Sequence, residues 1–124
     1  MPDTDALTKR GPLTTVVKPW GGEELLAHTE DYALKRIRVN KGEGSSLQYH
    51  NQKTESLYMV SGLLQFEIGK TEDSLVTLEL GPGECVDIPA GIIHRTLALE
   101  DVDVIEVSTP HLDDVVRLQD KYGR

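Results

Sequence analysis

The chain has 124 residues, 38% of them hydrophobic, and a formal net charge of −8. This length suits one domain that buries roughly two-thirds of its unfolded surface, and the acidity disfavours binding to nucleic acid or an anionic membrane. The apolar runs are too short to span a membrane and the acidic N-terminus does not resemble a secretory signal, so we expect a cytoplasmic protein. The single cysteine, Cys85, excludes an intramolecular disulfide and a Cys-rich zinc site, and we expect it to be a buried strand residue.

The first part of the chain divides into an arm and the start of a domain. Residues 1–12 show little periodicity, so we predict a flexible arm there and one domain over residues 13–124. The β-branched run from residue 13 to 18, ended by Pro19, predicts an edge strand. A short strand is predicted over residues 23–28.

Residues 32–40 form the clearest predicted strand. One face of it carries Ala33, Lys35, Ile37 and Val39. We expect this face to meet the core, which would place Lys35 inside the fold, where lysine is rare unless it is paired or functional. The alternative is that Lys35 lies near the strand end and extends its ammonium outward.

The rest of the chain consists of short alternating segments separated by glycine turns. Strands are predicted over residues 55–61, 63–69, 75–80, 85–88, 94–99 and 102–108. After Pro110 the apolar residues have helical spacing, with Asp113 and Asp114 near the start, so a short C-terminal helix is predicted. About ten short strands indicate an all-β fold, either an antiparallel sandwich or a small barrel.

The stretch between Gly42 and Gly62 concentrates polar side chains that can bind a metal. In an extended strand Gln48, His50 and Gln52 could point the same way, because residues two apart share a face. Glu55 could join them if the chain turns or bulges after His50. An imidazole, an amide oxygen and a carboxylate form a metal half-site that lacks a further ligand.

The missing ligand is expected at His94. The turn Pro89-Ala90-Gly91 precedes it, and a tight turn fixes where the imidazole points. Two neutral imidazoles and one carboxylate, from His50, His94 and Glu55, suffice for a catalytic metal with open positions. The alternative is that these are polar strand residues that face solvent.

These residues form two motifs that resemble those of the cupin superfamily, Gly42-x5-Gln48-x-His50-x4-Glu55-x6-Gly62 and Gly83-x5-Pro89-x-Gly91-x2-His94. Within the cupins, the chain resembles the C-terminal isomerase domain of type II mannose-6-phosphate isomerases. The matching segments are Lys18–Gly21, Leu34–Ile37, Ser46–His50, Ile88–Arg95 and Val116–Arg124. The resemblance implies a single cupin-type antiparallel β-barrel, or jelly roll, and a homodimer paired through edge strands.

The resemblance also implies a site and an activity. It places metal ligands at Gln48, His50, Glu55 and His94, usually with zinc, and iron, manganese or nickel as alternatives. The implied reaction is the interconversion of mannose 6-phosphate and fructose 6-phosphate through an enediol. Arg95 and Lys35 are candidate catalytic groups for the phosphate or the enediolate charge. For Arg95 the alternative is a solvated side chain, because its parity opposes that of His94.

Other functions remain open because this chain departs from the family pattern beside Glu55. Gln52-Lys53 stands where the family usually has His-Arg, and Ser56-Leu57 stands where His-Trp is usual. One alternative is another metal-dependent cupin enzyme of the iron dioxygenase type, because two histidines and one carboxylate also suit iron. The other is a non-catalytic module that binds a sugar or sugar nucleotide. Many relatives carry an N-terminal nucleotidyltransferase domain, for which 124 residues leave no room, so guanylyltransferase activity is not expected.

Overall fold

The computed structural model describes residues 9–119, which form eleven strands and one short 3-10 turn, η2 (Glu72–Ser74). The strands are β1 (Thr14–Lys18), β2 (Gly21–His28), β3 (Ala33–Val39), β4 (Leu47–Tyr49), β5 (Glu55–Ser61), β6 (Leu64–Gly69), β7 (Val76–Leu80), β8 (Cys85–Ile88), β9 (Ile93–Ala98), β10 (Val102–Ser108) and β11 (Val116–Gln119). Three of them, β5, β8 and β10, span the predicted residues, and the all-β prediction is confirmed.

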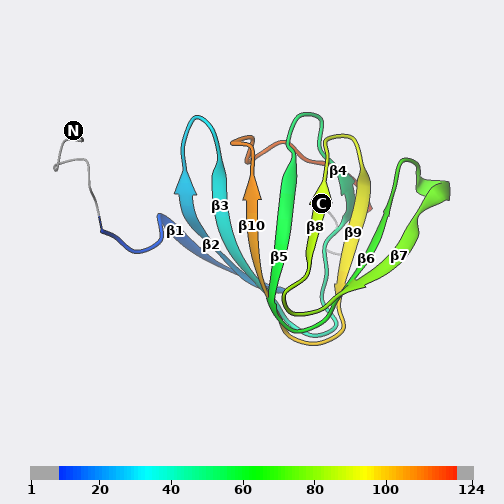
Figure 1. Cartoon of the computed structure of the whole chain (residues 1–124), viewed down its shortest axis with the longest axis horizontal. Helices are drawn as coiled ribbons and strands as arrows, with labels where there is room; N and C mark the ends of the chain where they lie inside the picture. The colour runs from blue at the N-terminus through cyan, green and yellow to red at the C-terminus, as the bar shows by residue number, and fades with distance from the viewer. Residues whose placement is uncertain (1–8, 120–124) are drawn as a thin grey trace.

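The strands form two antiparallel sheets that face each other as in a jelly roll (Figure 1). The first has the order β1-β2-β3-β10-β5-β8 and the second β11-β4-β9-β6-β7. The predicted edge strand near the N-terminus is β1, which pairs only with β2 among the described strands. Because β4 and β5 belong to different sheets, the loop between them carries the chain across the fold.

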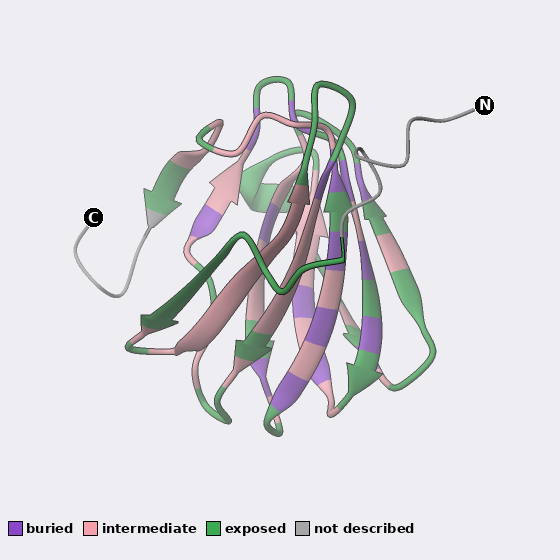
Figure 2. Ribbon diagram, turned by 90° about the vertical axis from the view of Figure 1, so that its left-hand side faces the viewer, coloured by how far each residue is buried: buried purple, intermediate pink, exposed green. Residues whose placement is uncertain are grey.

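The space between the sheets is filled by residues of one strand parity. Figure 2 shows buried and exposed segments alternating along the strands, as the pleat of a sheet requires. The largest fully buried side chains are Phe66, Met59 and Ile88. On β3 the predicted inward face is confirmed, because Ala33 is buried and Lys35 lines the interior cavity.

The predicted C-terminal helix is wrong. Residues 110–115 follow an irregular path, and the next residues form β11, which pairs with β4 through Val116↔Tyr49 and Arg117↔Gln48. Leu112 and Val115 line the interior cavity, but the backbone that carries them is not helical. A helix of two turns is only marginally stable by itself, whereas pairing with β4 satisfies the backbone through the sheet.

Three further expectations concern the chain ends, Cys85 and the membrane. Most of the predicted arm, residues 1–8, lies outside the described residues, and residues 9–12 have no regular structure. Cys85 is exposed, contrary to prediction, because the inward parity of β8 belongs to Val86 and Ile88. Over residues 9–119 there is no helix with the length and apolar character to cross a bilayer.

Candidate metal centre

A cavity of about 530 Å³ lies between the two sheets. Its walls are apolar where Leu57, Phe66 and Val104 contribute, and polar where the two motifs meet. All four predicted metal ligands line this cavity: Gln48, His50, Glu55 and His94. The structure therefore brings His94 together with three residues that lie 39 to 46 positions earlier in the sequence.

The strand crossing explains how these ligands meet. His50 directly follows β4, and the chain then crosses to the opposite sheet, where Glu55 begins β5. His94 lies on β9, beside β4, with Gln48 as its register partner. The N–H of Gly91 donates to the carbonyl of His50 at 2.7 Å and so ties the two motifs together. Gly91 has φ +86°, which favours glycine at this turn.

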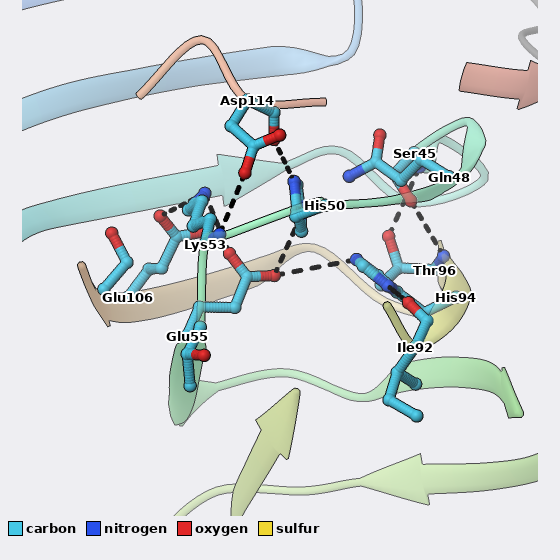
Figure 3. A network of polar contacts seen from close by, with 12 residues as sticks. Ser45, Gln48, His50, Lys53, Glu55, Ile92, His94, Thr96, Glu106 and Asp114 are labelled. Carbon is cyan, nitrogen blue, oxygen red and sulfur yellow. Dashed lines mark hydrogen bonds and ion pairs between the residues drawn. The ribbon is translucent and has the colours of Figure 1, made fainter. Parts of the chain in front are cut away.

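The carboxylate of Glu55 lies between the two imidazoles (Figure 3). Its Oε1 is 3.6 Å from Nε2 of His94 and 3.8 Å from Nε2 of His50. These ligand atoms all lie within 4.8 Å of one another, and all three side chains are buried. Ligands of a tetrahedral zinc ion are roughly 3.4 Å apart, given metal–ligand distances of about 2.0–2.2 Å. The cluster therefore has nearly the spacing that a metal requires.

Backbone carbonyls orient both imidazoles toward Glu55. The Nδ1–H of His50 donates to the carbonyl of Asp114, and that of His94 donates to the carbonyl of Ile92 at 3.0 Å. A carbonyl can only accept, so Nδ1 carries the proton in each ring and Nε2 keeps its lone pair. Among residues 9–119, the buried Nε2 of His50 finds no hydrogen-bond partner. This unpartnered acceptor is what a metal ion would satisfy, so the donor set fits a metal.

The surroundings also act on the protonation of each candidate ligand, since a metal needs neutral imidazoles and an ionised carboxylate. Burial lowers the pKa of His94, so this imidazole is neutral at neutral pH. Burial alone would raise the pKa of Glu55, but the contact with His50 and the charge of Lys53 hold it well below its usual range. Burial would likewise lower the pKa of His50, yet Glu55 and the Asp114 carbonyl raise it. Metal binding must therefore compete with a proton at His50.

Of the other three predicted site residues, two line the cavity and one lies outside it. Gln48 lines the cavity near His94, and its Oε1 accepts a hydrogen bond from Ser46 at 2.7 Å. Lys35 also faces the cavity, where its ammonium lies 3.6 Å from Glu23. Arg95 instead pairs with Glu67 on the neighbouring strand β6, at 2.7 Å, and is not among the residues that line this cavity.

Two buried residues beside Glu55 belong to the site but were not predicted as site residues from the sequence. The ammonium of Lys53 lies 2.9 Å from Oε2 of Glu55 and 3.4 Å from Oε2 of Glu106. Lys53 and Glu106 are each only 6% exposed. Burial and the charge of Glu55 raise the pKa of Glu106 to about 7. Strand parity could have revealed Glu106, which follows Val102 and Val104 on the inward face of β10.

Asp114 is the third missed residue. Its carboxylate accepts hydrogen bonds from the backbone N–H groups of Asn51, Gln52 and Lys53 at 3.0, 2.6 and 2.9 Å. Gln52, which was expected to share the face of His50, is exposed and contributes its backbone to this contact. Nothing local in the sequence indicates the contact, because the partners are more than sixty residues apart.

The fold and the cluster define the class of protein. The chain is a cupin: its two antiparallel sheets face each other and enclose a His/Glu/His cluster that could bind a metal. Solved cupin structures superpose on the chain. KdgF from Halomonas sp. does so with a TM-score of 0.69 at 25% identity, over 79% of this chain and 87% of that one. The capsular polysaccharide assembling protein CapF from Staphylococcus aureus has a TM-score of 0.73 at 23% identity, over 87% and 34% of the two chains, which shows the fold alone.

Within the cupins, the family is more specific. The model of the family "Mannose-6-phosphate isomerase C-terminal" matches residues 7–120, and the chain belongs to this family. The mannose-1-phosphate guanylyltransferase of Salmonella montevideo is 37% identical over 114 residues, and the xanthan biosynthesis protein XanB of Xanthomonas campestris is 34% identical over the same length. Each alignment covers 88% of this chain and 23% of the relative, so the chain spans about a quarter of the length of these relatives.

Proposed function

We propose that the chain is a metal-dependent isomerase domain that interconverts an aldose phosphate and a ketose phosphate, of the mannose 6-phosphate and fructose 6-phosphate type. The observation that carries the proposal is the buried cluster in which two imidazole Nε2 atoms face one carboxylate oxygen. Membership of the mannose-6-phosphate isomerase C-terminal family supports the choice of reaction.

The residues that would hold the metal are His50, Glu55 and His94, with the amide oxygen of Gln48 as a fourth ligand. When bound, a divalent metal supplies a Lewis acid that polarises a carbonyl or hydroxyl of the substrate and favours loss of the adjacent carbon proton. Zinc suits two imidazoles and a carboxylate, as iron, manganese and nickel also can. The protein holds the imidazoles in the required tautomer through their Nδ1–H bonds.

The substrate's negative charge needs a cation in the cavity. We assign this role to Lys35, because its side chain faces the cavity whereas Arg95 of β9 is paired with Glu67 of β6 and does not line the cavity. Lys35→Met should raise KM for a sugar phosphate about tenfold or more, since a hydrogen bond to a charged group contributes about 1.5–3 kcal/mol. Lys70→Met is the matched control, because Lys70 is exposed and does not line the cavity.

The reaction is tested by incubating metal-loaded protein with mannose 6-phosphate or fructose 6-phosphate in heavy water and following the products by NMR. Interconversion with deuterium incorporated beside the carbonyl is expected. A folded, metal-loaded protein that turns over neither sugar would refute this substrate pair. Metal analysis of the purified protein separates the alternatives, since iron together with oxygen consumption would support an oxygenase and a lack of metal would support a binding module.

The ligand set is tested separately with His94→Ala. The variant should lose the bound metal while circular dichroism shows that the all-β fold is retained. Metal retained at the wild-type stoichiometry would remove His94 from the ligand set.

We further propose that the domain works in the cytoplasm as a homodimer. The basis for the dimer is β1, which pairs only with β2 among the described strands and exposes Val16 and Val17. An exposed strand edge is a ready site for pairing with a second chain. Light scattering should give the mass of a dimer, and a monomeric mass at working concentration would contradict this arrangement.

A further inference from the structure

The segment that follows β10 closes one side of the metal centre. From Pro110 it crosses beside the loop between β4 and β5 and then enters β11, which pairs with β4 (Figure 1). Leu112 and Val115 of this segment line the cavity. The segment therefore contributes a wall of the site although it lies far from both motifs in the sequence.

One side chain attaches this segment to the metal-binding loop. The carboxylate of Asp114 accepts hydrogen bonds from three consecutive backbone N–H groups, those of residues 51, 52 and 53. These residues connect β4 to β5 and lie outside both strands, so the carboxylate supplies their N–H groups with an acceptor. Hydrogen bonds to a charged group are shorter and stronger than neutral ones, which makes this a firm attachment.

The backbone of the same residue acts on a ligand. The carbonyl of Asp114 accepts the Nδ1–H of His50, as Figure 3 shows. The carboxylate fixes residue 114 against the loop, and the carbonyl then fixes the tautomer and ring orientation of His50. If the attachment were lost, the imidazole could carry its proton on Nε2, and the lone pair that faces Glu55 would be blocked.

We propose that Asp114 is a positioning residue that couples docking of the C-terminal segment to metal binding at His50, Glu55 and His94. This inference rests on the proposed metal centre but is independent of the substrate and of the isomerase reaction. Coupling between two binding events is reciprocal, so segment docking strengthens metal binding by the same factor by which metal strengthens docking. The C-terminal segment is therefore part of the metal site.

The first test measures metal affinity. Zinc dissociation constants are determined by competition with a chelator for the wild type, Asp114→Ala and Asp114→Asn, with Asp73→Asn as an exposed control on η2. Loss of a group that orients a metal-bound histidine weakens metal binding about 10–100-fold. We expect a loss of this size for Asp114→Ala, a smaller one for Asp114→Asn, which keeps one acceptor oxygen, and no change for Asp73→Asn.

The second test detects positioning directly. In the metal-free wild type, at a pH high enough for the imidazole of His50 to be neutral, nitrogen NMR should show the tautomer protonated on Nδ1, and Asp114→Ala should show a mixture of tautomers. Zinc should slow hydrogen exchange at the amides of residues 51–53 and 116–117 in the wild type, and much less in Asp114→Ala. A merely structural role for Asp114 would change stability without altering the tautomer or this metal dependence.

The outcomes separate the two proposals. If the wild type binds zinc and folded Asp114→Ala binds it equally well with an unchanged His50 tautomer, the coupling is overturned while the metal centre stands. If the wild type binds no zinc, cobalt, manganese or iron, the metal centre fails and the coupling fails with it. If Asp114→Ala does not fold, Asp114→Asn decides the coupling by the same measurements.

Discussion

Lys53 contacts both buried carboxylates, Glu55 at 2.9 Å and Glu106 at 3.4 Å. Burial alone would lower the pKa of Lys53, but these two carboxylates raise it, so the ammonium is charged at neutral pH. Lys53→Met preserves most of the side-chain volume and removes the charge. The two carboxylates would then be left in the interior without a cation between them. An uncompensated charge in the interior strongly destabilises the folded state.

The expected cost is a substantial part of the domain's stability. Removing one partner of a buried ion pair destabilises a protein by about 3–5 kcal/mol, against a typical total of about 5–15 kcal/mol. Glu106 can relieve part of the cost by taking up a proton, since its pKa is already raised to about 7. For Lys53→Met we therefore expect the free energy of unfolding to fall by an amount near the lower end of this range, about 3 kcal/mol at pH 7.5.

The assay is urea unfolding followed by circular dichroism, with a chelator present because bound metal would add its own stabilisation. Lys70→Met is the control, and an exposed substitution of this kind should change stability by less than about 0.5 kcal/mol. The double variant Lys53→Met/Glu106→Gln should be more stable than Lys53→Met, because it removes the second buried charge. An unchanged stability in Lys53→Met, or a double variant less stable than the single one, would show that Lys53 does not compensate the two buried carboxylates.

Three further predictions concern stability. The backbone N–H groups of Gln52 and Lys53 lower the pKa of Asp114 to about 2. This carboxylate therefore stabilises the fold fully above its unfolded pKa of about 3.9, and the contribution is lost as the pH falls toward 2. Asp114→Asn should be less stable than the wild type in urea at pH 7, with the difference closing near pH 2; a constant difference would contradict this. Phe66→Ala should cost about 3–5 kcal/mol in urea unfolding, because Phe66 is fully buried; a loss below 1 kcal/mol would be inconsistent with that packing. Gly62→Ala should cost at least about 1 kcal/mol, because φ is +88° and the added Cβ would lie 2.2 Å from the carbonyl oxygen of Asp101; an unchanged melting temperature would argue against that strain.

Much of the fold could be predicted from local patterns. The strands show an alternation of apolar and polar residues and end at glycine turns, and both signals depend only on neighbouring residues. Strand parity is also a local signal, and it accounts for the inward direction of Lys35 and the outward direction of Arg95. Residues 112–118 were misassigned because their apolar spacing also suits a helix, and pairing with β4 decides the conformation.

The candidate metal centre could likewise be predicted only in part. The spacing of His50 and Glu55, the turn before His94 and the resemblance to cupins predict three residues, His50, Glu55 and His94, that the fold gathers into one cluster able to hold a metal. The groups that neutralise or orient these residues were not predictable from local sequence patterns. Glu106 reaches Lys53 because β10 pairs with β5, and Asp114 reaches the loop because the last segment crosses beside it.

The side chains that can bind a metal are evident from the amino-acid sequence, because ligand chemistry and turn geometry are properties of short segments. The groups that orient and neutralise those side chains are set by the folded chain. A buried carboxylate or imidazole acquires its tautomer, its charge and its direction from whatever the folded chain places within hydrogen-bond distance. In this protein those neighbours, such as Lys53 at Glu55 and Asp114 at His50, are set by strand pairing and by the path of the C-terminal segment.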